Sequence, residues 1–222
     1  MRKRQMAVVA AGLSVLTLAA VRFGGWAVVT VDTPPDYLVV GKPTEITFAV
    51  RQHAVTPRND LTPSIEVRSG SKTITGMTWS LRRDGLYRSR FTIPSTGEWD
   101  ITIRSGWMAS YGKLLPIQAI DSGARAVAFN QPEHGRRLFA AKGCVTCHVH
   151  GDVPVDGQLQ SFGPQLTERR FPAEYLARFL ANPSIKPPTN GRNQMPNPQL
   201  NQLEIASIIA FINGEGRVAT KR

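Results

Sequence analysis

The chain has 222 residues, of which 41% are hydrophobic, and a formal net charge of +11. This length and composition predict globular structure, enough for two small domains, and exclude a largely disordered protein. The basic excess is +3 up to Asp32, +4 over residues 36–125 and +4 over residues 126–222, with no stripe of Lys and Arg. Charge spread this evenly argues against nucleic acid as a partner, and it favours an acidic protein surface or an anionic membrane surface.

Residues 1–25 are typical of a secretory signal peptide. Basic residues occupy positions 2–4, and an uncharged apolar run follows at residues 6–21. The run is shorter than the roughly 20 residues of a membrane-spanning helix. A cleaved signal peptide is therefore favoured over an uncleaved N-terminal membrane anchor. Either one predicts a periplasmic protein, free or held at the cytoplasmic membrane.

Residues 26–122 are predicted to form an all-β domain. Apolar and polar residues alternate over residues 44–51, 87–93 and 98–104, which is the pattern of half-buried antiparallel strands. Further strands are expected at residues 26–31, 64–68, 72–79 and 114–120. Short strands separated by turn signals, such as Asp84-Gly85, indicate a β-sandwich.

The stretch with Gly85, Tyr87, Pro94, Gly97 and Trp99 matches the pattern G-x-Y … P-x-x-G-x-W. This pattern resembles that of periplasmic immunoglobulin-like sandwiches of the FixH-like or YtkA-like type, some of which are linked to copper handling. The resemblance implies a docking or assembly module.

Two features of this domain have both a functional and a structural interpretation. His53, Met77 and Met108 are possible soft ligands for copper; alternatively, His53 ends a strand and the methionines fill core or turn positions. Arg88 and Arg90 are expected to lie beside Arg104 on a neighbouring strand, as a docking patch or as an ordinary solvated sheet face.

The rest of the chain is predicted to be helical. Residues 123–131 form a linker, residues 132–216 a second domain and residues 217–222 a basic tail. One helix starts at Pro132 and runs toward Cys147, with Gly135 on one of its faces. Further helices are expected at residues 172–180 and at about 198–213, the latter ended by Gly214.

Cys144-Val145-Thr146-Cys147-His148 is a C-x-x-C-H motif, which indicates attachment of one haem c. Each thiol can form a thioether with a haem vinyl group, and His148 then binds the iron. A zinc site would need a further pair of Cys or His ligands, and none follows at the right spacing. A thioredoxin-like dithiol would need a βαβ context, which the upstream sequence lacks.

Met195 is the only methionine after this motif, and it lies in a polar loop bounded by Gly191 and Pro196. A thioether in such a loop suggests the second axial ligand of the iron. The alternative is a methionine that fills a gap in the core. His134 and His150 are less suitable as ligands, because one precedes the motif on its helix and the other follows His148 too closely.

The order of these elements resembles class I mono-haem cytochrome c. The resemblance covers about ninety residues: the helix with Gly135 and Phe139, the C-x-x-C-H motif, Gly163-Pro164-x-Leu166, Met195-Pro196, and the helix with Ile208 and Phe211. It implies that the Pro164 carbonyl accepts a hydrogen bond from His148 and that Leu166 packs on the haem. It also implies that the first and last helices cross closely at Gly135.

The function expected from these features is one-electron transfer rather than enzymatic catalysis, because iron bound by both His and Met suits electron transfer. The partner would be a redox protein or respiratory complex in the periplasm or membrane. A second hypothesis is a copper-handling or respiratory-complex assembly factor with a redox haem domain. A third is an enzyme or sensor in which Met195 dissociates to admit a small ligand.

Overall fold

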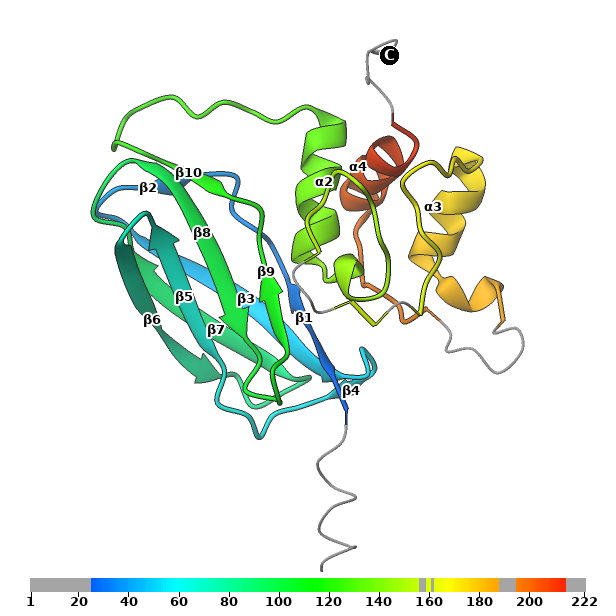
Figure 1. Cartoon of the computed structure of the whole chain (residues 1–222), viewed down its shortest axis with the longest axis horizontal. Helices are drawn as coiled ribbons and strands as arrows, with labels where there is room; N and C mark the ends of the chain where they lie inside the picture. Colours follow the sequence, from blue (N-terminus) through cyan, green and yellow to red (C-terminus); the bar gives the residue numbers. More distant parts are fainter. Residues whose placement is uncertain (1–24, 156–158, 161, 188–194, 215–222) are drawn as a thin grey trace, which may run out of the picture.

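The computed structural model describes residues 25–155, 159–160, 162–187 and 195–214. The predicted leader before Gly25, most of the loop before Met195 and the predicted basic tail lie outside the described residues. The described chain forms an N-terminal curled, mixed β-sheet, a half-barrel, followed by a region with three α-helices (Figure 1). None of the helices in the described ranges is long and apolar enough to cross a membrane.

The strands occur where the alternation predicted them, with three short additions. Their bounds are β1 (Ala27–Val31), β2 (Leu38–Val39), β3 (Pro43–Gln52), β4 (Thr56–Pro57), β5 (Ser64–Ser69), β6 (Lys72–Ser80), β7 (Leu86–Thr92), β8 (Gly97–Arg104), β9 (Tyr111–Lys113) and β10 (Ile117–Ile120). The sheet order is β1-β3-β7-β6-β5-β8-β10-β2, with β4 beside β3 and β9 beside β8. All pairs are antiparallel except β2 with β10, where Leu38 lies opposite Ala119.

The sheet curls because β6 changes partner along its length. Its first half pairs with β5, up to Gly76 opposite Ile65, and its second half pairs with β7 from Met77 onward. A Cβ at Gly76 would overlap the Ile65 side chain and lie 3.1 Å from the carbonyl oxygen of Arg90. Glycine thus permits the close approach at this bend. β6 thereby joins the strands on its two sides into one continuous path.

The concave side of the sheet holds the core of this part. Trp99, Tyr87 and Phe48 are its largest buried side chains. The polar atoms of two of these side chains form hydrogen bonds. Trp99 Nε1 donates to the Ser95 carbonyl oxygen at 3.1 Å, and the Tyr87 hydroxyl donates to the Arg58 carbonyl oxygen at 2.8 Å. The inward residues of the alternating runs therefore form the core, as their pattern predicted.

The predicted arginine patch is wrong in one respect. β7, which carries Arg88 and Arg90, pairs with β3 and β6, whereas Arg104 ends β8, which pairs with β5, β9 and β10. Arg104 is therefore not on a neighbouring strand. Arg88 lies 3.6 Å from the Glu45 carboxylate in an exposed ion pair, as expected of a solvated sheet face.

The three predicted helices are confirmed as α2 (Gln131–Ala141), α3 (Ala173–Ala181) and α4 (Gln202–Ile212). Asn130 caps α2 by accepting from the backbone N–H of Glu133 at 3.0 Å. The Glu133 carboxylate also pairs with Arg136 at 2.6 Å and with Arg137 at 3.0 Å. α4 starts later than expected, because Asn201 is its N-cap and forms a reciprocal capping box with Glu204.

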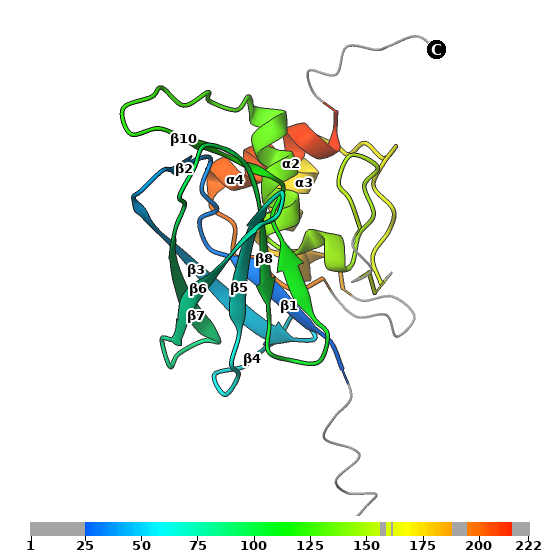
Figure 2. The same ribbon diagram turned by 60° about the vertical axis from the view of Figure 1, so that its left-hand side comes forward.

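Helices α2 and α4 cross closely, as the resemblance implied. A Cβ at Gly135 would overlap the Ser207 carbonyl group, and it would lie 2.9 Å from Cβ of Phe211. α2 lies between the β-sheet and α4, and α3 packs on α4 (Figures 1 and 2). Only glycine allows the two backbones to approach to this degree.

Lys142 joins the sheet to the helices. It caps the C-terminus of α2, and its Nζ lies 2.7 Å from Glu204 Oε1 and 2.6 Å from the carbonyl oxygen of Asp32, just after β1. Arg137 adds a second link by donating to the Pro116 carbonyl oxygen at 2.8 Å. The two parts are therefore held together by specific polar contacts.

Candidate functional site

The C-x-x-C-H residues lie on a tight turn after α2. Gly143, with φ of 78°, ends the helix, and the 3₁₀ turn η1 (Cys144–Thr146) follows. The backbone N–H groups of Cys147 and His148 both donate to the Cys144 carbonyl oxygen, at 3.1 and 2.9 Å. This turn brings the two thiols and the imidazole to the wall of one cavity of about 280 Å³.

The imidazole of His148 has a defined orientation. Its Nδ1 lies 3.0 Å from the carbonyl oxygen of Pro164. A carbonyl can only accept, so Nδ1 carries the proton and Nε2 keeps the lone pair needed to bind a metal. A Cβ at Gly163 would overlap the His148 ring, so the glycine makes room for it.

The protonation states of these groups follow from burial. Burial lowers the pKa of His148, and the hydrogen bond to Pro164 opposes the shift only in part, so the imidazole is neutral at neutral pH. Burial also raises the pKa of Cys144 to about 12 and that of Cys147 to about 11. Both thiols are therefore protonated at neutral pH in this structure.

The cavity is lined mainly by apolar side chains from all three helices and from the segment before α3. Leu166 is among them and is only 7% exposed. The apolar lining residues from these elements include Phe139, Phe162, Leu166, Phe171, Tyr175, Leu176, Phe179, Leu180, Ile208 and Ile212. The cavity thus offers an apolar environment next to the two thiols and the imidazole.

Met195 lines the same cavity, together with Pro196. It lies 47 residues after His148 in sequence, on the segment that leads to α4. The structure therefore places Met195, which the sequence singled out separately, at the same cavity as the motif residues Cys144, Cys147 and His148.

His134 and His150, the two other histidines considered as iron ligands, make their contacts outside the cavity. Nδ1 of His134 lies 3.2 Å from the Ser207 hydroxyl, between α2 and α4. His150 is 1% exposed and packs on Phe211 with ring centroids 4.2 Å apart, and its Nδ1 accepts from the backbone N–H of Asp152. Neither histidine lines the cavity.

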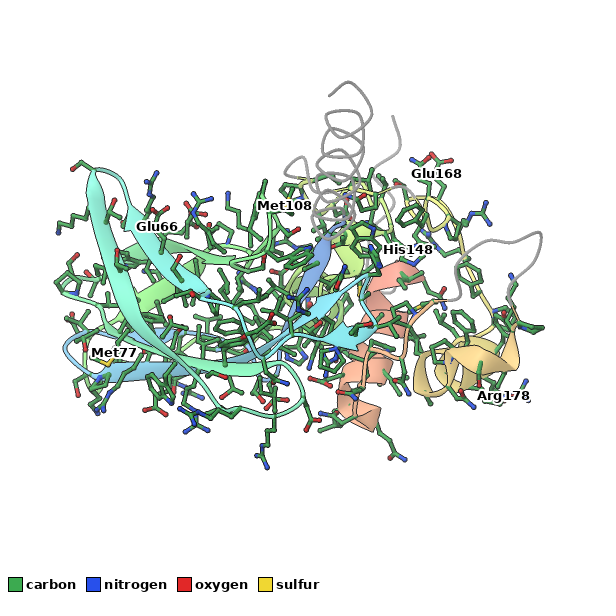
Figure 3. The ribbon with its side chains drawn as sticks, turned by 90° about the horizontal axis from the view of Figure 1, so that it is seen from below. Glu66, Met77, Met108, His148, Glu168 and Arg178 are labelled. Atoms are coloured by element: carbon green, nitrogen blue, oxygen red, sulfur yellow. The ribbon has the colours of Figure 1, made fainter. Side chains whose placement is uncertain are left out.

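The candidate copper ligands of the β-sheet part do not lie close to one another. Met77 on β6 is 74% exposed, and Met108 is 64% exposed in the loop after β8. Figure 3 places Met77 and Met108 well apart, with Met77 at the far end of the sheet from the helices. Within the described ranges, no group of three or more His, Cys, Asp or Glu side chains could hold a metal ion.

Two residues of the β-sheet part belong to the site although the sequence did not predict them there. Trp26 and His53 line the same cavity as His148. They precede the motif by more than ninety residues, and no local pattern signals their approach. Only the packing of the sheet against the helices brings them to the cavity.

No protein-family model matches the sequence. No curated protein matches it either. Among solved structures, partial likenesses cover 40–44% of this chain, at TM-scores of 0.28–0.31. They include a chain assigned as a glycoside hydrolase from Bacteroides vulgatus ATCC 8482 (23% identity, 17% of that chain covered), the ZirS C-terminal domain (20%, 65% covered) and the endo-beta-1,4-mannanase from Thermotoga petrophila (14%, 20% covered). Scores this low carry no functional argument.

Proposed function

We propose that this protein is an extracytoplasmic c-type cytochrome that transfers single electrons through one covalently bound haem c. One observation carries the proposal: the two motif thiols, an oriented neutral imidazole and a thioether line a single apolar cavity. The proposal includes the finer fold assignment, a class I cytochrome c domain that follows an immunoglobulin-like β domain.

Five residues at the cavity have a defined role in this proposal. Cys144 and Cys147 would hold the haem through thioethers, and His148 Nε2 and the Met195 sulfur would bind its iron. The Pro164 carbonyl fixes the tautomer and ring orientation of His148 and makes Nε2 more basic. The bound haem would supply an iron that changes oxidation state by one electron. With both His148 and Met195 available to bind the iron, electron transfer would be favoured over substrate chemistry.

The competing interpretations of the motif fit this geometry less well. A redox dithiol needs a thiol with a lowered pKa, whereas burial raises the pKa of both Cys144 and Cys147. A structural zinc site needs four clustered ligands, and no such cluster of His, Cys, Asp or Glu occurs in the part of the chain that the structure describes. A cavity with a mainly apolar lining suits a porphyrin rather than a bare ion.

The proposed setting is the periplasm or the outer face of the cytoplasmic membrane, reached through the predicted signal or anchor at residues 1–25. The partner would be a redox protein or respiratory complex, and the net charge of +11 would favour an acidic docking surface.

The pyridine haemochrome spectrum of the purified protein, secreted by a host that attaches haem c, tests the proposal. We expect the absorption bands of a haem with two thioethers, and the bands of a haem with one thioether in Cys144→Ser and in Cys147→Ser. Met108→Leu, at an exposed loop position, is the control and should keep the wild-type spectrum. A wild-type protein with no haem, or with haem whose vinyl groups are both unmodified, would overturn the proposal.

A further inference from the structure

The cavity lined by Cys144, Cys147 and His148 is a crevice, and the β-sheet part contributes an aromatic wall to it. The Trp26 ring lies 5.6 Å from the His53 ring and 5.5 Å from the Phe162 ring, centroid to centroid. All three side chains line the cavity that also contains Cys147 and His148. Trp26 and His53 belong to the β-sheet part, whereas Phe162 follows the haem motif, so this wall crosses the boundary between the two parts.

The backbone holds this wall in place. Trp26 immediately precedes β1, and its carbonyl oxygen accepts from the backbone N–H of His53 at 3.0 Å. His53 has φ of 52° and Ala54 has φ of 62°, so the chain turns sharply after β3 and brings the imidazole back toward Trp26. Left-handed φ values at two successive non-glycine residues are uncommon because they are unfavourable. Such a turn persists only where surrounding contacts, here including the hydrogen bond from His53 to Trp26, stabilise it.

A second contact connects β3 to the segment between Met195 and α4. Arg51, near the end of β3, donates from its guanidinium to Gln199 Oε1 at 3.3 Å. Gln199 lies four residues after Met195 and has φ of 55°. The end of β3 thus contacts the segment that carries Met195, and the turn that follows β3 lines the crevice near His148.

We propose that Trp26 and His53 are positioning residues of the redox site, so that the β-sheet part completes the crevice and is not only a docking module. This inference rests on the proposed function. The two side chains would exclude water from the edge of a haem held by Cys144 and Cys147. Because water stabilises the more highly charged oxidised state, the wall raises the reduction potential.

The test is the reduction potential of the full-length, haem-loaded protein. We expect Trp26→Ala to shift the potential in the negative direction, and His53→Asn to shift it less in the same direction. Asparagine is chosen because it tolerates the left-handed backbone at this position. Trp26→Phe keeps an aromatic ring and should restore most of the wild-type potential.

Trp79→Ala is the matched control. Trp79 lies on β6 opposite Arg88 and does not line the crevice, so its removal should leave the potential unchanged. Equal potentials for Trp26→Ala, Trp79→Ala and the wild type would overturn the inference while leaving the proposed function intact. If Trp26→Ala fails to fold, the NMR spectra of haem-loaded Trp26→Phe and His53→Asn test the inference instead. Both should move the haem methyl resonances of the loaded protein, and Trp79→Phe should not. Unmoved resonances in both would refute the inference.

A wild-type protein that carries no covalent haem gives a different result. It overturns the proposed function, and this inference falls with it, before any variant of the wall is made. The two failures are therefore distinguishable.

Discussion

Replacing Lys142 by Met should destabilise the protein strongly, because this buried lysine links the end of α2 to α4 and to the end of β1. Its side chain is 4% exposed, and that of Glu204 is 11% exposed. Methionine keeps the length of the stem but removes the charge, which leaves Glu204 Oε1 and the Asp32 carbonyl oxygen without the lysine donor. Glu204 Oε2 would still accept from the backbone N–H of Asn201 at 3.0 Å.

Breaking a buried ion pair by removing one partner costs about 3–5 kcal/mol. The remaining Asn201 contact places the expected loss near the lower limit, about 3 kcal/mol. At about 2–4 °C per kcal/mol for a chain of this size, the melting temperature should fall by about 6–12 °C. Thermal and urea unfolding, followed by far-UV circular dichroism, measure both quantities.

Two further variants make this prediction specific. Lys113→Met removes an exposed lysine that lies 3.9 Å from the Asp100 carboxylate, and it should cost less than about 1 kcal/mol. The double variant Lys142→Met/Glu204→Gln removes both buried charges and should recover part of the loss. If Lys142→Met unfolds at the same temperature as Lys113→Met, the assignment of Lys142 as a buried link is refuted.

The remaining predictions concern pH dependence and the crevice. Burial acts to raise the pKa of Glu133, but its arginine partners outweigh it and hold the pKa below the ordinary value of 4.5. Glu133→Gln should therefore lower the free energy of unfolding by about 1–2 kcal/mol at pH 7. This difference from the wild type should vanish as the pH falls through the lowered pKa of Glu133. A difference that stays constant down to pH 2 would contradict the ion pairing. Gly163→Ala should displace the His148 ring and reduce the haem content of the purified protein, so an unchanged haem content and spectrum would refute the close packing. Met195→Ala should abolish the methionine-to-iron charge-transfer band and lower the reduction potential, whereas Met77→Ala, at an exposed position, should leave both unchanged. A retained band would exclude Met195 as a ligand.

Much of the secondary structure could be predicted because it depends on local periodicity. The alternation over β7 and β8 gives one buried face and one face that is exposed or half-buried, and the apolar face of α3 follows the helical period. The parallel pair of β2 with β10 could not be predicted, since β2 has only two residues and shows no period. The role of β6 in curling the sheet depends on a long-range contact at Gly76 rather than on any repeat.

The candidate site divides in the same way. Cys144, Cys147 and His148 are close together because one turn carries them, so the motif alone predicted their proximity. Trp26 and His53 reach the crevice only because the sheet packs on the helices. That packing depends on side chains such as Lys142, whose buried pair with Glu204 spans 62 positions of the chain. Contacts of this kind have no signature in a single sequence.

The central claim is that a haem is covalently attached at Cys144 and Cys147. Intact-protein mass spectrometry after extraction with acidic acetone tests it most directly, because only a covalently bound haem survives this treatment. We predict that the extracted polypeptide keeps its colour and exceeds the mass of the same polypeptide without haem, with any cleaved leader subtracted, by one haem, whereas the Cys144→Ala/Cys147→Ala variant does not. A colourless polypeptide without this added mass, from a host that attaches haem c to other proteins, would contradict the claim.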